Sequence, residues 1–243
     1  MIKNIVLKLL SIFDHFYQKK IISFLKKNNL DNFDVFFDVG AHKGESIELF
    51  LKKFKIKNFY SFEASPINFK MLNDKKYFFK NKFKNVEIIM ENIALSSSIK
   101  KINFKQSYES SSSTLSEINV KSKYFLKKKA ILNIFGKKDF YNNIEIQTNT
   151  LKNYINENYI KKVDFLKIDT EGYEYEIILG LEEKINNVKL IMFEHHYDDM
   201  IKKSYKYSDI KKILNDNGFE QIYKIKMPFR KTFEYIFINI NKT

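Results

Sequence analysis

The sequence contains no cysteine in 243 residues, and this absence excludes several kinds of site. Without thiols the chain can form neither a disulfide framework nor a thiolate metal centre. A metal site would have to use carboxylates together with the four histidines. The lack of cysteine also fits a reducing compartment, so we expect a cytoplasmic protein.

Long apolar runs are missing too. Residues 1–25 are rich in Ile, Leu and Phe, but charged residues interrupt every run before it reaches the length that spans a bilayer. No small-residue cleavage site follows, so no targeting signal is predicted. The pattern favours an amphipathic helix within an N-terminal extension, residues 1–33. We expect this helix to pack on the following domain or in a homodimer; peripheral attachment to the inner face of a membrane is the alternative.

Acidic residues are fewer than basic ones, 29 against 43, so the formal net charge is +14. The lysines are spread along the whole chain, which favours a solvated basic surface over one dedicated anion site. An anionic substrate, a membrane or a nucleic acid is the alternative explanation of the charge. The length and a hydrophobic content of 44% are sufficient for one α/β domain with a full core.

The G-x-G-x-x-G fingerprint of dinucleotide-binding folds is absent as well. The nearest stretch, Val35–Glu45, reads V-F-F-D-V-G-A-H-K-G-E and has His42 and Glu45 where that fingerprint requires glycine. A nicotinamide or flavin site is therefore disfavoured. The stretch still predicts a strand, a tight turn and a helix, and Gly40 and Gly44 allow a ligand to approach the backbone. We interpret it as a cofactor-binding loop; an ordinary turn is the alternative.

An acidic residue ends the next predicted strand. Glu63 lies about 20 residues after the glycine loop, where a carboxylate can accept both hydroxyls of a ribose. Ser65 follows as the predicted N-cap of a helix. The third strand is followed by Asn92 and Ile93, which reach the same edge if the sheet is doubly wound and then face an adenine base. An adenosine-type cofactor fits these features, while a plain loop at 92–93 is the alternative.

Two later strands also deliver polar residues to this edge. The stretch V-D-F-L-K-I-D-T-E-G predicts a buried strand that ends at Asp169, with Glu171 in the following turn. Two close carboxylates raise each other's pKa unless a cation lies between them, so we favour a site over simple helix capping. The strand K-L-I-M-F-E-H-H then brings Glu194, His195 and His196. Asp169, Glu194 and His195 form a candidate site for a hard or borderline divalent ion.

Residues 101–146 are the least regular part, and we treat them as a variable insertion on the acceptor side of the domain. Short strands are expected at 102–105 and 144–148, a polar loop at the serines 110–113, and a lysine-rich helix over 120–135. The tail predicts a helix over 207–217 and two strands, 219–225 and 234–239. Their connection is too short for a helical crossover, so these two strands should be antiparallel.

Several motifs, in this order, resemble the landmarks of the FkbM-type methyltransferases, which use S-adenosylmethionine. They are F-D-V-G-A-H-K-G-E, F-E-A-S-P, E-N-I-A-L-S, S-S-T-L and F-L-K-I-D-T-E-G-Y-E, the last followed by M-F-E. The resemblance runs from about Val35 to Asn239 and leaves the N-terminal helix outside it. Many relatives have an aspartate after Thr-Leu, where this chain has Lys152, so the resemblance does not support a helix cap at that point.

The resemblance implies a Rossmann-like class I methyltransferase domain over residues 34–243. Its sheet would have seven mostly parallel strands with the last strand antiparallel. Asp38, Gly40 and Gly44 would approach the methionine part of the cofactor, Glu63 the ribose, and Asn92 with Ile93 the adenine. The full set assigned to the cofactor is Asp38, Gly40, His42, Gly44, Glu63, Ala64, Ser65, Asn92, Ile93 and Asp169.

Members of this family mostly methylate sugar hydroxyls, so the resemblance implies O-methylation of a nucleotide-activated sugar or a polysaccharide or capsule precursor. A hydroxyl needs a base or a metal to lose its proton, and Glu171 is the candidate base with His196 as its competitor. Mg or Mn would bind at Asp169, Glu194 and His195. An RNA methyltransferase is one alternative, but no RNA-binding module or Asn-Pro-Pro-Tyr motif is present, so we expect no nucleic-acid partner. A non-catalytic role in a glycan assembly complex is the other.

Overall fold

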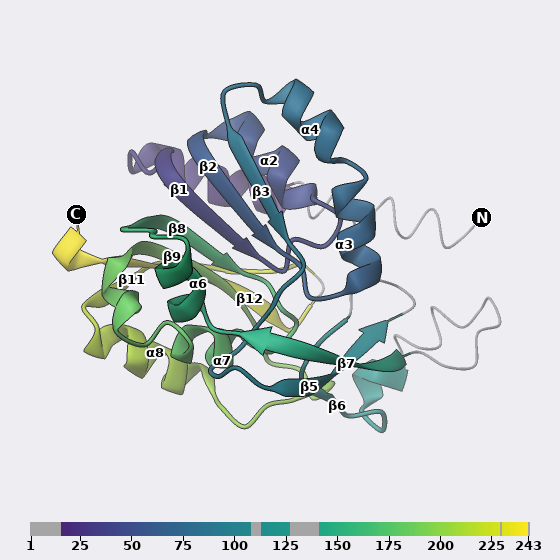
Figure 1. Cartoon of the computed structure of the whole chain (residues 1–243). Coiled ribbons are helices and arrows are strands. Elements are labelled where there is room, and N and C mark those ends of the chain that lie inside the picture. The colour runs from purple at the N-terminus through teal and green to yellow at the C-terminus, as the bar shows by residue number, and fades with distance from the viewer. Residues whose placement is uncertain (1–15, 108–112, 127–140, 229, 243) are drawn as a thin grey trace.

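Seven strands form the sheet at the centre of the molecule (Figure 1). The computed structural model describes residues 16–107, 113–126, 141–228 and 230–242. The order across the sheet is β3-β2-β1-β8-β9-β12-β11. These strands are β1 (Asn32–Val39), β2 (Lys55–Phe62), β3 (Glu87–Glu91), β8 (Val163–Ile168), β9 (Val188–His196), β11 (Phe219–Lys226) and β12 (Thr232–Asn239).

The strand directions are those that the sequence predicted. β3, β2, β1, β8 and β9 pair in parallel, whereas β12 is antiparallel to both β9 and β11. The expected α/β, Rossmann-like sheet with seven strands and an antiparallel last strand is confirmed. The carboxyl ends of β1, β2, β3, β8 and β9 therefore meet at one edge, where the predicted cofactor and catalytic residues lie.

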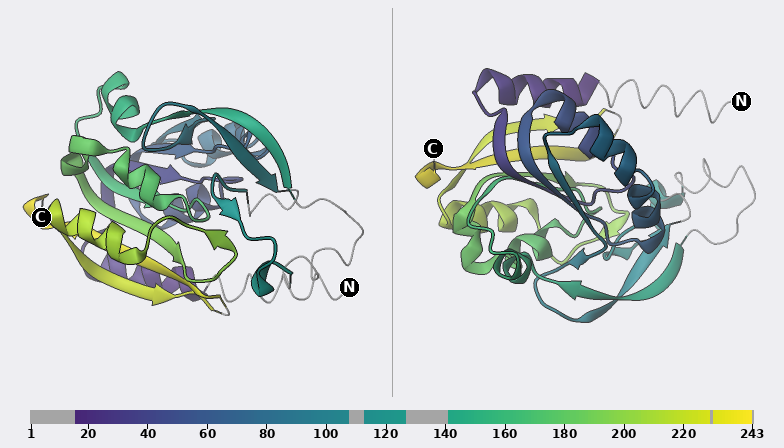
Figure 2. Two further views of the ribbon diagram at one scale, coloured as in Figure 1. Left: turned by 90° about the horizontal axis from the view of Figure 1, so that it is seen from below. Right: turned by 45° about the horizontal axis from the view of Figure 1, so that its top comes forward.

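Helices cover both faces of this sheet (Figure 2). On one face lie the helix over residues 16–27 and α2 (Glu45–Lys53), α3 (Pro66–Asn73) and α4 (Lys76–Lys82). The other face carries α6 (Leu151–Glu157), α7 (Glu174–Leu179), the 3-10 helix η1 (Glu182–Asn187) and α8 (Tyr207–Asp216). A short 3-10 helix, η2 (Ile240–Lys242), follows β12.

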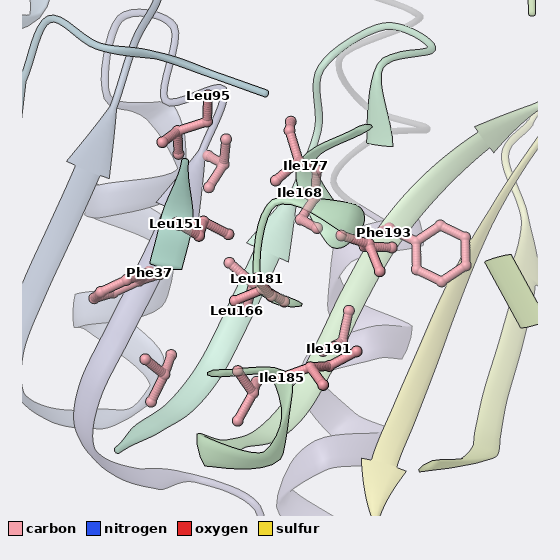
Figure 3. Packing of buried hydrophobic residues seen from close by; sticks show 14 of the residues in the cluster. Phe37, Leu95, Leu151, Leu166, Ile168, Ile177, Leu181, Ile185, Ile191 and Phe193 are labelled. Atoms are coloured by element: carbon pink, nitrogen blue, oxygen red, sulfur yellow. The ribbon is translucent and has the colours of Figure 1, made fainter. Parts of the chain in front are cut away.

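Phenylalanine side chains fill the core on both sides of β1. Phe36 stacks on Phe59 and on Phe165, with ring centroids 4.7 Å apart in each pair. Phe37 belongs to the cluster on the opposite face, together with Leu166 and with Leu151 of α6 and Ile177 of α7 (Figure 3). A strand buried on both faces needs apolar residues at successive positions, which explains the continuous V-F-F run in the sequence.

Two helix starts have capping bonds: the predicted one at Ser65, and one at Thr150, where the resemblance did not support a cap. The Ser65 hydroxyl accepts a hydrogen bond from the backbone N–H of Asn68 at 3.2 Å, and Pro66 follows in the first turn of α3. The Thr150 hydroxyl accepts from the N–H of Asn153 at 3.0 Å, so Thr150 caps α6. The departure at Lys152 therefore leaves this helix start intact.

The described part of the N-terminal helix packs on the sheet. In residues 16–27, Tyr17, Ile21, Ile22 and Leu25 are buried in the same core cluster as β1, β2 and β12. The prediction that this helix packs on the domain is confirmed for this part. β1 begins at Asn32, so the sheet includes the last two residues of the predicted extension 1–33. Among the helices within the described ranges, none is long and apolar enough to cross a membrane.

The predicted insertion 101–146 contributes strands to two small sheets near the carboxyl edge (Figure 1). One has the order β4-β7-β5, from β4 (Ala94–Leu95), β5 (Lys101–Ser107) and β7 (Tyr141–Asn149); the other pairs β6 (Glu117–Ile118) with β10 (Ile201–Lys202). Both expected strands are thus present and longer than predicted. Of the expected helix 120–135, residues 123–126 are helical; residues 127–140 and the serines 110–112 lie outside the described residues.

Candidate functional site

The loop after β1 is drawn tightly against β2 and β8. Gly40 has φ 86°, and a Cβ added to it would lie 1.8 Å from the carbonyl oxygen of Asp169. The backbone N–H groups of Gly40 and Ala41 both donate to the carbonyl of Phe62, at 2.9 and 3.0 Å. Glycine is therefore required at position 40, because any side chain would separate β1 from the end of β8.

Glu63 joins this loop to the start of α3. Its Oε2 accepts the N–H of His42 at 2.8 Å, and its Oε1 accepts the N–H of Ser65 at 2.9 Å. His42 adopts φ 49°, an unusual value for a residue other than glycine. Burial raises the pKa of Glu63, whereas the two backbone N–H groups act to lower it. The predicted juxtaposition of Glu63 with the glycine loop is present, and the carboxylate bridges that loop and the N-cap of α3.

Asn92 and Ile93 lie beside this bridge. The side-chain amide of Asn92 donates to the backbone carbonyl of Glu63 at 2.8 Å and to that of Ala64 at 3.4 Å. Asn92 and Ile93 line an open groove next to the cofactor edge, together with residues of β7 and α6. The other residues that line this groove are Ile99, Gln147, Thr148, Asn149 and Asn153. The structure thus brings the predicted ribose and adenine residues together.

A buried lysine that the sequence analysis did not single out lies behind the loop. Lys167 of β8 is the register partner of Asp38 in β1, and its Nζ lies 2.9 Å from Asp38 Oδ1 and 3.4 Å from Asp169 Oδ2. Burial raises the pKa of Asp38, and Lys167 opposes this rise. For Asp169 burial also acts to raise the pKa, but Lys167 and a hydrogen bond from Glu194 outweigh it and lower the pKa. Lys167 is therefore the cation that lets two neighbouring carboxyls share this edge.

The two adjacent histidines at the end of β9 lie in different environments. His195 is surrounded by the rings of Tyr197, Tyr205 and Tyr207, and its Nε2 lies 3.5 Å from Lys203 Nζ. Burial and Lys203 lower its pKa to about 3, so His195 is neutral. Side chains alternate along a strand, so His195 points to the opposite face from its neighbours in the sequence.

The structure consequently does not bring the three predicted metal ligands together. Asp169 and Glu194 are in contact, but His195 belongs to the tyrosine cluster on the other face. Across the described ranges, no group of three or more histidine, aspartate or glutamate side chains is arranged to hold a metal ion. The period-two alternation of β9 is the signal in the sequence that separates His195 from Glu194.

His196 takes the place that was expected for His195. Its Nε2 lies 3.3 Å from Glu194 Oε1 and 3.6 Å from Glu171 Oε2, and its Nδ1 lies 3.5 Å from Asp198 Oδ2. Burial alone would lower the pKa of His196, but Glu194, Asp198 and Glu171 raise it to about 10. Burial and the charge of Asp169 raise the pKa of Glu194. At neutral pH His196 is thus a cation among carboxyl groups.

Glu171 sits in a strained turn held from the insertion. It has φ 52°, and its carbonyl accepts the hydroxyl of Thr114 at 2.9 Å. The next carbonyl, of Gly172, accepts the hydroxyl of Ser116 at 2.8 Å and that of Tyr205 at 3.0 Å. These contacts give a structural role to Thr114 of the S-S-T-L motif and to Ser116 just after it, since both hold the backbone of the turn that carries Glu171. The Glu171 side chain is 23% exposed, so a substrate can reach it.

A hydrogen bond links the N-terminal helix to the acids of this edge. The Tyr17 hydroxyl donates to Glu234 Oε2 at 2.6 Å, and Glu234 is the register partner of Glu194 in the β12–β9 pair. Burial raises the pKa of Glu234 to about 7, although Tyr17 acts to lower it. Neither residue was predicted, because both lie far from every motif in the sequence.

Comparisons with known proteins agree with this arrangement. A family described as the methyltransferase FkbM domain matches residues 38–220. The magnesium protoporphyrin IX methyltransferase (ChlM) of Synechocystis PCC 6803, solved with bound SAH, has a similar fold, with a TM-score of 0.54 and 12% identity over 96% of this chain and 86% of that protein. The same enzyme with bound SAM gives a TM-score of 0.51 and 11% identity over 94% of this chain and 80% of that one.

A methyltransferase FkbM from Methylobacillus flagellatus KT has a TM-score of 0.49 and 13% identity over 84% of this chain. The present chain spans 43% of the length of that protein. A search of curated protein sequences finds no match. Because the family match covers most of the sequence, including the glycine loop, Glu63 and the Asp169–Glu194 edge, the chain belongs to the FkbM methyltransferase family.

Proposed function

We propose that this methyltransferase uses S-adenosylmethionine to methylate a sugar hydroxyl. The observation that carries the proposal is the bridge of Glu63 between the N–H groups of His42 and Ser65, beside Gly40 at the carboxyl edge. A carboxylate at the end of the second strand, next to a glycine loop, suits the ribose of an adenosine group. The similar folds of methyltransferases solved with SAM or SAH support the same cofactor.

The residues of the edge fit this cofactor. Asp38 Oδ2 is buried and makes no hydrogen bond within the described residues, so it can accept one from the ammonium group of the methionine part. Asp169, whose side chain is 41% exposed, adds negative charge that attracts the sulfonium. When bound, the cofactor supplies a methyl group that is already activated for transfer.

The chain's own part is to hold the acceptor hydroxyl and take its proton. Glu171 is the candidate base because its carboxylate is reachable and its turn is fixed by Thr114 and Ser116. In this scheme the hydroxyl proton passes to a Glu171 oxygen while the acceptor oxygen bonds the methyl carbon, whose bond to sulfur breaks so that the demethylated thioether leaves. A fixed base of this kind typically contributes about 100- to 10,000-fold in rate.

His196 is better suited to orienting Glu171 than to replacing it. With a pKa of about 10, its imidazole is protonated at neutral pH and has no free nitrogen to accept a proton. The cation lies 3.6 Å from the Glu171 carboxylate and can hold it in place. His196 thus becomes a positioning residue in this proposal, not the base.

A divalent cation does not fit the residues that are present. Burial and the charge of Asp169 raise the pKa of Glu194, which disfavours the deprotonated carboxylate that a metal ion requires as a ligand. Lys167 and His196 already supply positive charge on either side of these two acids. No step of the proposed mechanism therefore passes through Mg or Mn.

A nucleotide-activated sugar or a polysaccharide precursor is the acceptor class that we propose. The groove beside Asn92 offers the amides of Gln147, Asn149 and Asn153, and amides can both donate to and accept from sugar hydroxyls. The basic surface would favour a sugar that carries a diphosphate. Family membership supports the choice of a sugar, and the charge alone supports the diphosphate.

Calorimetry with S-adenosylmethionine tests the cofactor assignment. We expect binding by the wild-type chain and a loss of at least about tenfold in affinity for Glu63→Gln, since an amide oxygen cannot accept both ribose hydroxyls as a carboxylate does. Glu220→Gln on the exposed side of β11 is the matched control and should bind like the wild type. Equal affinity for Glu63→Gln would contradict the assignment of Glu63 to the ribose.

Transfer of a labelled methyl group tests the acceptor. Nucleotide sugars, bare sugars, capsule fragments and total RNA are offered in parallel, and we expect label in a sugar, released by glycan hydrolysis and stable to nuclease. Label in RNA would replace the sugar proposal with the RNA alternative. Cofactor binding without transfer to any acceptor would favour the non-catalytic alternative.

A further inference from the structure

The outer side of α3 and α4 exposes large apolar side chains. Ile67, Met71, Tyr77 and Phe78 are exposed by 55%, 43%, 78% and 49%, respectively. We call these four residues, with the lysines around them, the α3–α4 surface. Figure 1 shows both helices along the outside of the molecule, next to β3. Four large apolar side chains so close in sequence and left in water call for an explanation.

Helical spacing places three of these residues on one side. A two-residue turn, Asp74–Lys75, joins α3 to α4, and the backbone bonds from Asp74 N–H to Lys70 and from Phe79 N–H to Lys75 link this turn to both helices. Leu72 and Phe79, seven positions apart, are buried against the sheet. Ile67, Met71 and Phe78 repeat at four and seven positions, so they form a second stripe that faces outward. The exposure thus follows from the helical pattern itself.

This outward stripe is bordered by positive charge. Between positions 66 and 85 the sequence has one acidic residue, Asp74, and six lysines: Lys70, Lys75, Lys76, Lys80, Lys82 and Lys84. Lys82 lies over the ring of Phe78, 4.7 Å from its centroid, and pairs with Glu48. Long lysine stems around apolar side chains can lie along a bilayer surface with their ammonium groups at the phosphates.

The apolar side of the N-terminal helix, by contrast, is buried in the core. Over residues 16–27 the apolar face packs on the sheet, with Tyr17, Ile21 and Leu25 buried. This described part therefore has no such face to offer a membrane. The combination of exposed apolar side chains and clustered lysines lies instead on α3 and α4.

We propose that the α3–α4 surface binds the surface of an anionic lipid bilayer. Ile67 and Met71 gain from contact with acyl chains but cannot stack on nucleic-acid bases, so a bilayer fits this surface better than RNA does. A bilayer also accepts scattered apolar side chains without the shape complementarity that a protein partner requires. The inference does not depend on the sugar acceptor, because it concerns a different surface of the molecule.

The position of the α3–α4 surface determines which edge of the protein would face the bilayer. α3 begins after Ser65, whose N–H is bound by Glu63, so the α3–α4 surface starts directly beside the cofactor edge. Binding through α3 and α4 would bring that edge close to the lipid headgroups. An acceptor at or near a membrane would then be within reach of the pocket.

Sedimentation of the full chain with lipid vesicles tests the proposal. We expect binding to phosphatidylcholine vesicles that contain phosphatidylglycerol, weak binding to pure phosphatidylcholine, and release by salt. Ile67→Ser with Phe78→Ser should weaken the partition coefficient at least about tenfold. Lys76→Glu with Lys80→Glu should weaken it at least about 25-fold, since each lysine contributes about fivefold near an anionic surface.

Matched variants elsewhere on the surface serve as controls. Tyr159→Ser removes an aromatic ring that is 89% exposed, and Lys161→Glu with Lys211→Glu makes the same change of charge away from α3 and α4; both should bind vesicles like the wild type. Thermal unfolding and calorimetry with S-adenosylmethionine check that every variant is folded. Equal vesicle binding by the α3–α4 variants and the controls, or no binding by the wild type, would overturn the proposal, and so would RNA binding that these variants abolish while vesicle binding persists.

Discussion

The two halves of the carboxyl edge are built by different interactions. In the β1–β2 half, the hydrogen bonds involve backbone groups: the N–H groups of Gly40 and Ala41 donate to Phe62, and Glu63 accepts from two backbone N–H groups. In the β8–β9 half, charged side chains contact each other, with Lys167 beside Asp169 and His196 beside Glu171 and Glu194. One half is a backbone cradle and the other a network of buried charges.

This difference suggests a division of labour. Backbone geometry is insensitive to pH and suits a site that must hold one cofactor in one orientation. Charged side chains can accept or release protons, which the transfer to a hydroxyl requires. Changes at Glu171 and His196 should therefore alter rate and pH dependence more than they alter cofactor affinity.

The largest expected effect follows from changing Glu171. Glu171→Gln should reduce kcat about 100- to 10,000-fold, because an amide cannot take the acceptor proton. Calorimetry should give a cofactor affinity within about twofold of the wild type, since Glu171 belongs to the other half of the edge. A rate within a few-fold of the wild type would show that another group is the base.

A large loss in the free energy of unfolding is expected when the buried cation Lys167 is removed. Lys167→Met leaves Asp38 and Asp169 without their shared partner, and loss of one member of a buried ion pair typically costs about 3–5 kcal/mol. Urea unfolding at neutral pH measures this change. The double variant Asp38→Asn with Lys167→Met should recover part of the loss; a single variant as stable as the wild type would mean that Lys167 does not balance these acids.

A smaller effect is expected in the pH dependence of stability. The pKa of Glu234 is about 7 in the folded chain against 4.5 for a free glutamate, so protonation favours the folded state. Its stabilisation is complete below about pH 4.5 and is lost as pH rises through 7, by up to about 3 kcal/mol at 1.36 kcal/mol per unit.

Glu234→Gln keeps an acceptor for Tyr17 but cannot ionise, so its free energy of unfolding should lack this loss. Urea unfolding of both chains between pH 4.5 and pH 8 gives the comparison. Parallel curves for the wild type and the variant would contradict the raised pKa.

Much of the fold could be predicted because its signals are local. The glycines of the first loop, the acid at the end of β2 and the N-cap at Ser65 each depend on a few adjacent residues. The alternation of apolar and polar runs then fixed the strands, and the short connection near Pro228 indicated the antiparallel pair. The β1–β2 half of the edge was therefore accessible from the sequence.

The β8–β9 half was less accessible because it depends on contacts between distant strands. Lys167 meets Asp38 only through the β1–β8 register, and Thr114 reaches Glu171 across 57 positions. The choice of His195 over His196 as a metal ligand ignored the alternation of side chains along β9, which was the available signal. Burial lowers the pKa of both histidines, and only the carboxyl groups around His196 make the charge states of the two rings differ; those neighbours follow from tertiary packing that no motif records.

The hydrogen bond from Tyr17 to Glu234 has a practical consequence for recombinant work. Both partners lie outside the family match at 38–220, one before it and one after it. Trimming the gene to the matched segment would delete β12, most of β11 and all but the last two residues of β1, and would expose the core that these strands cover. Expression plasmids for kinetics or crystallisation should therefore encode both flanks, since the boundaries of a family profile are not those of the folding unit.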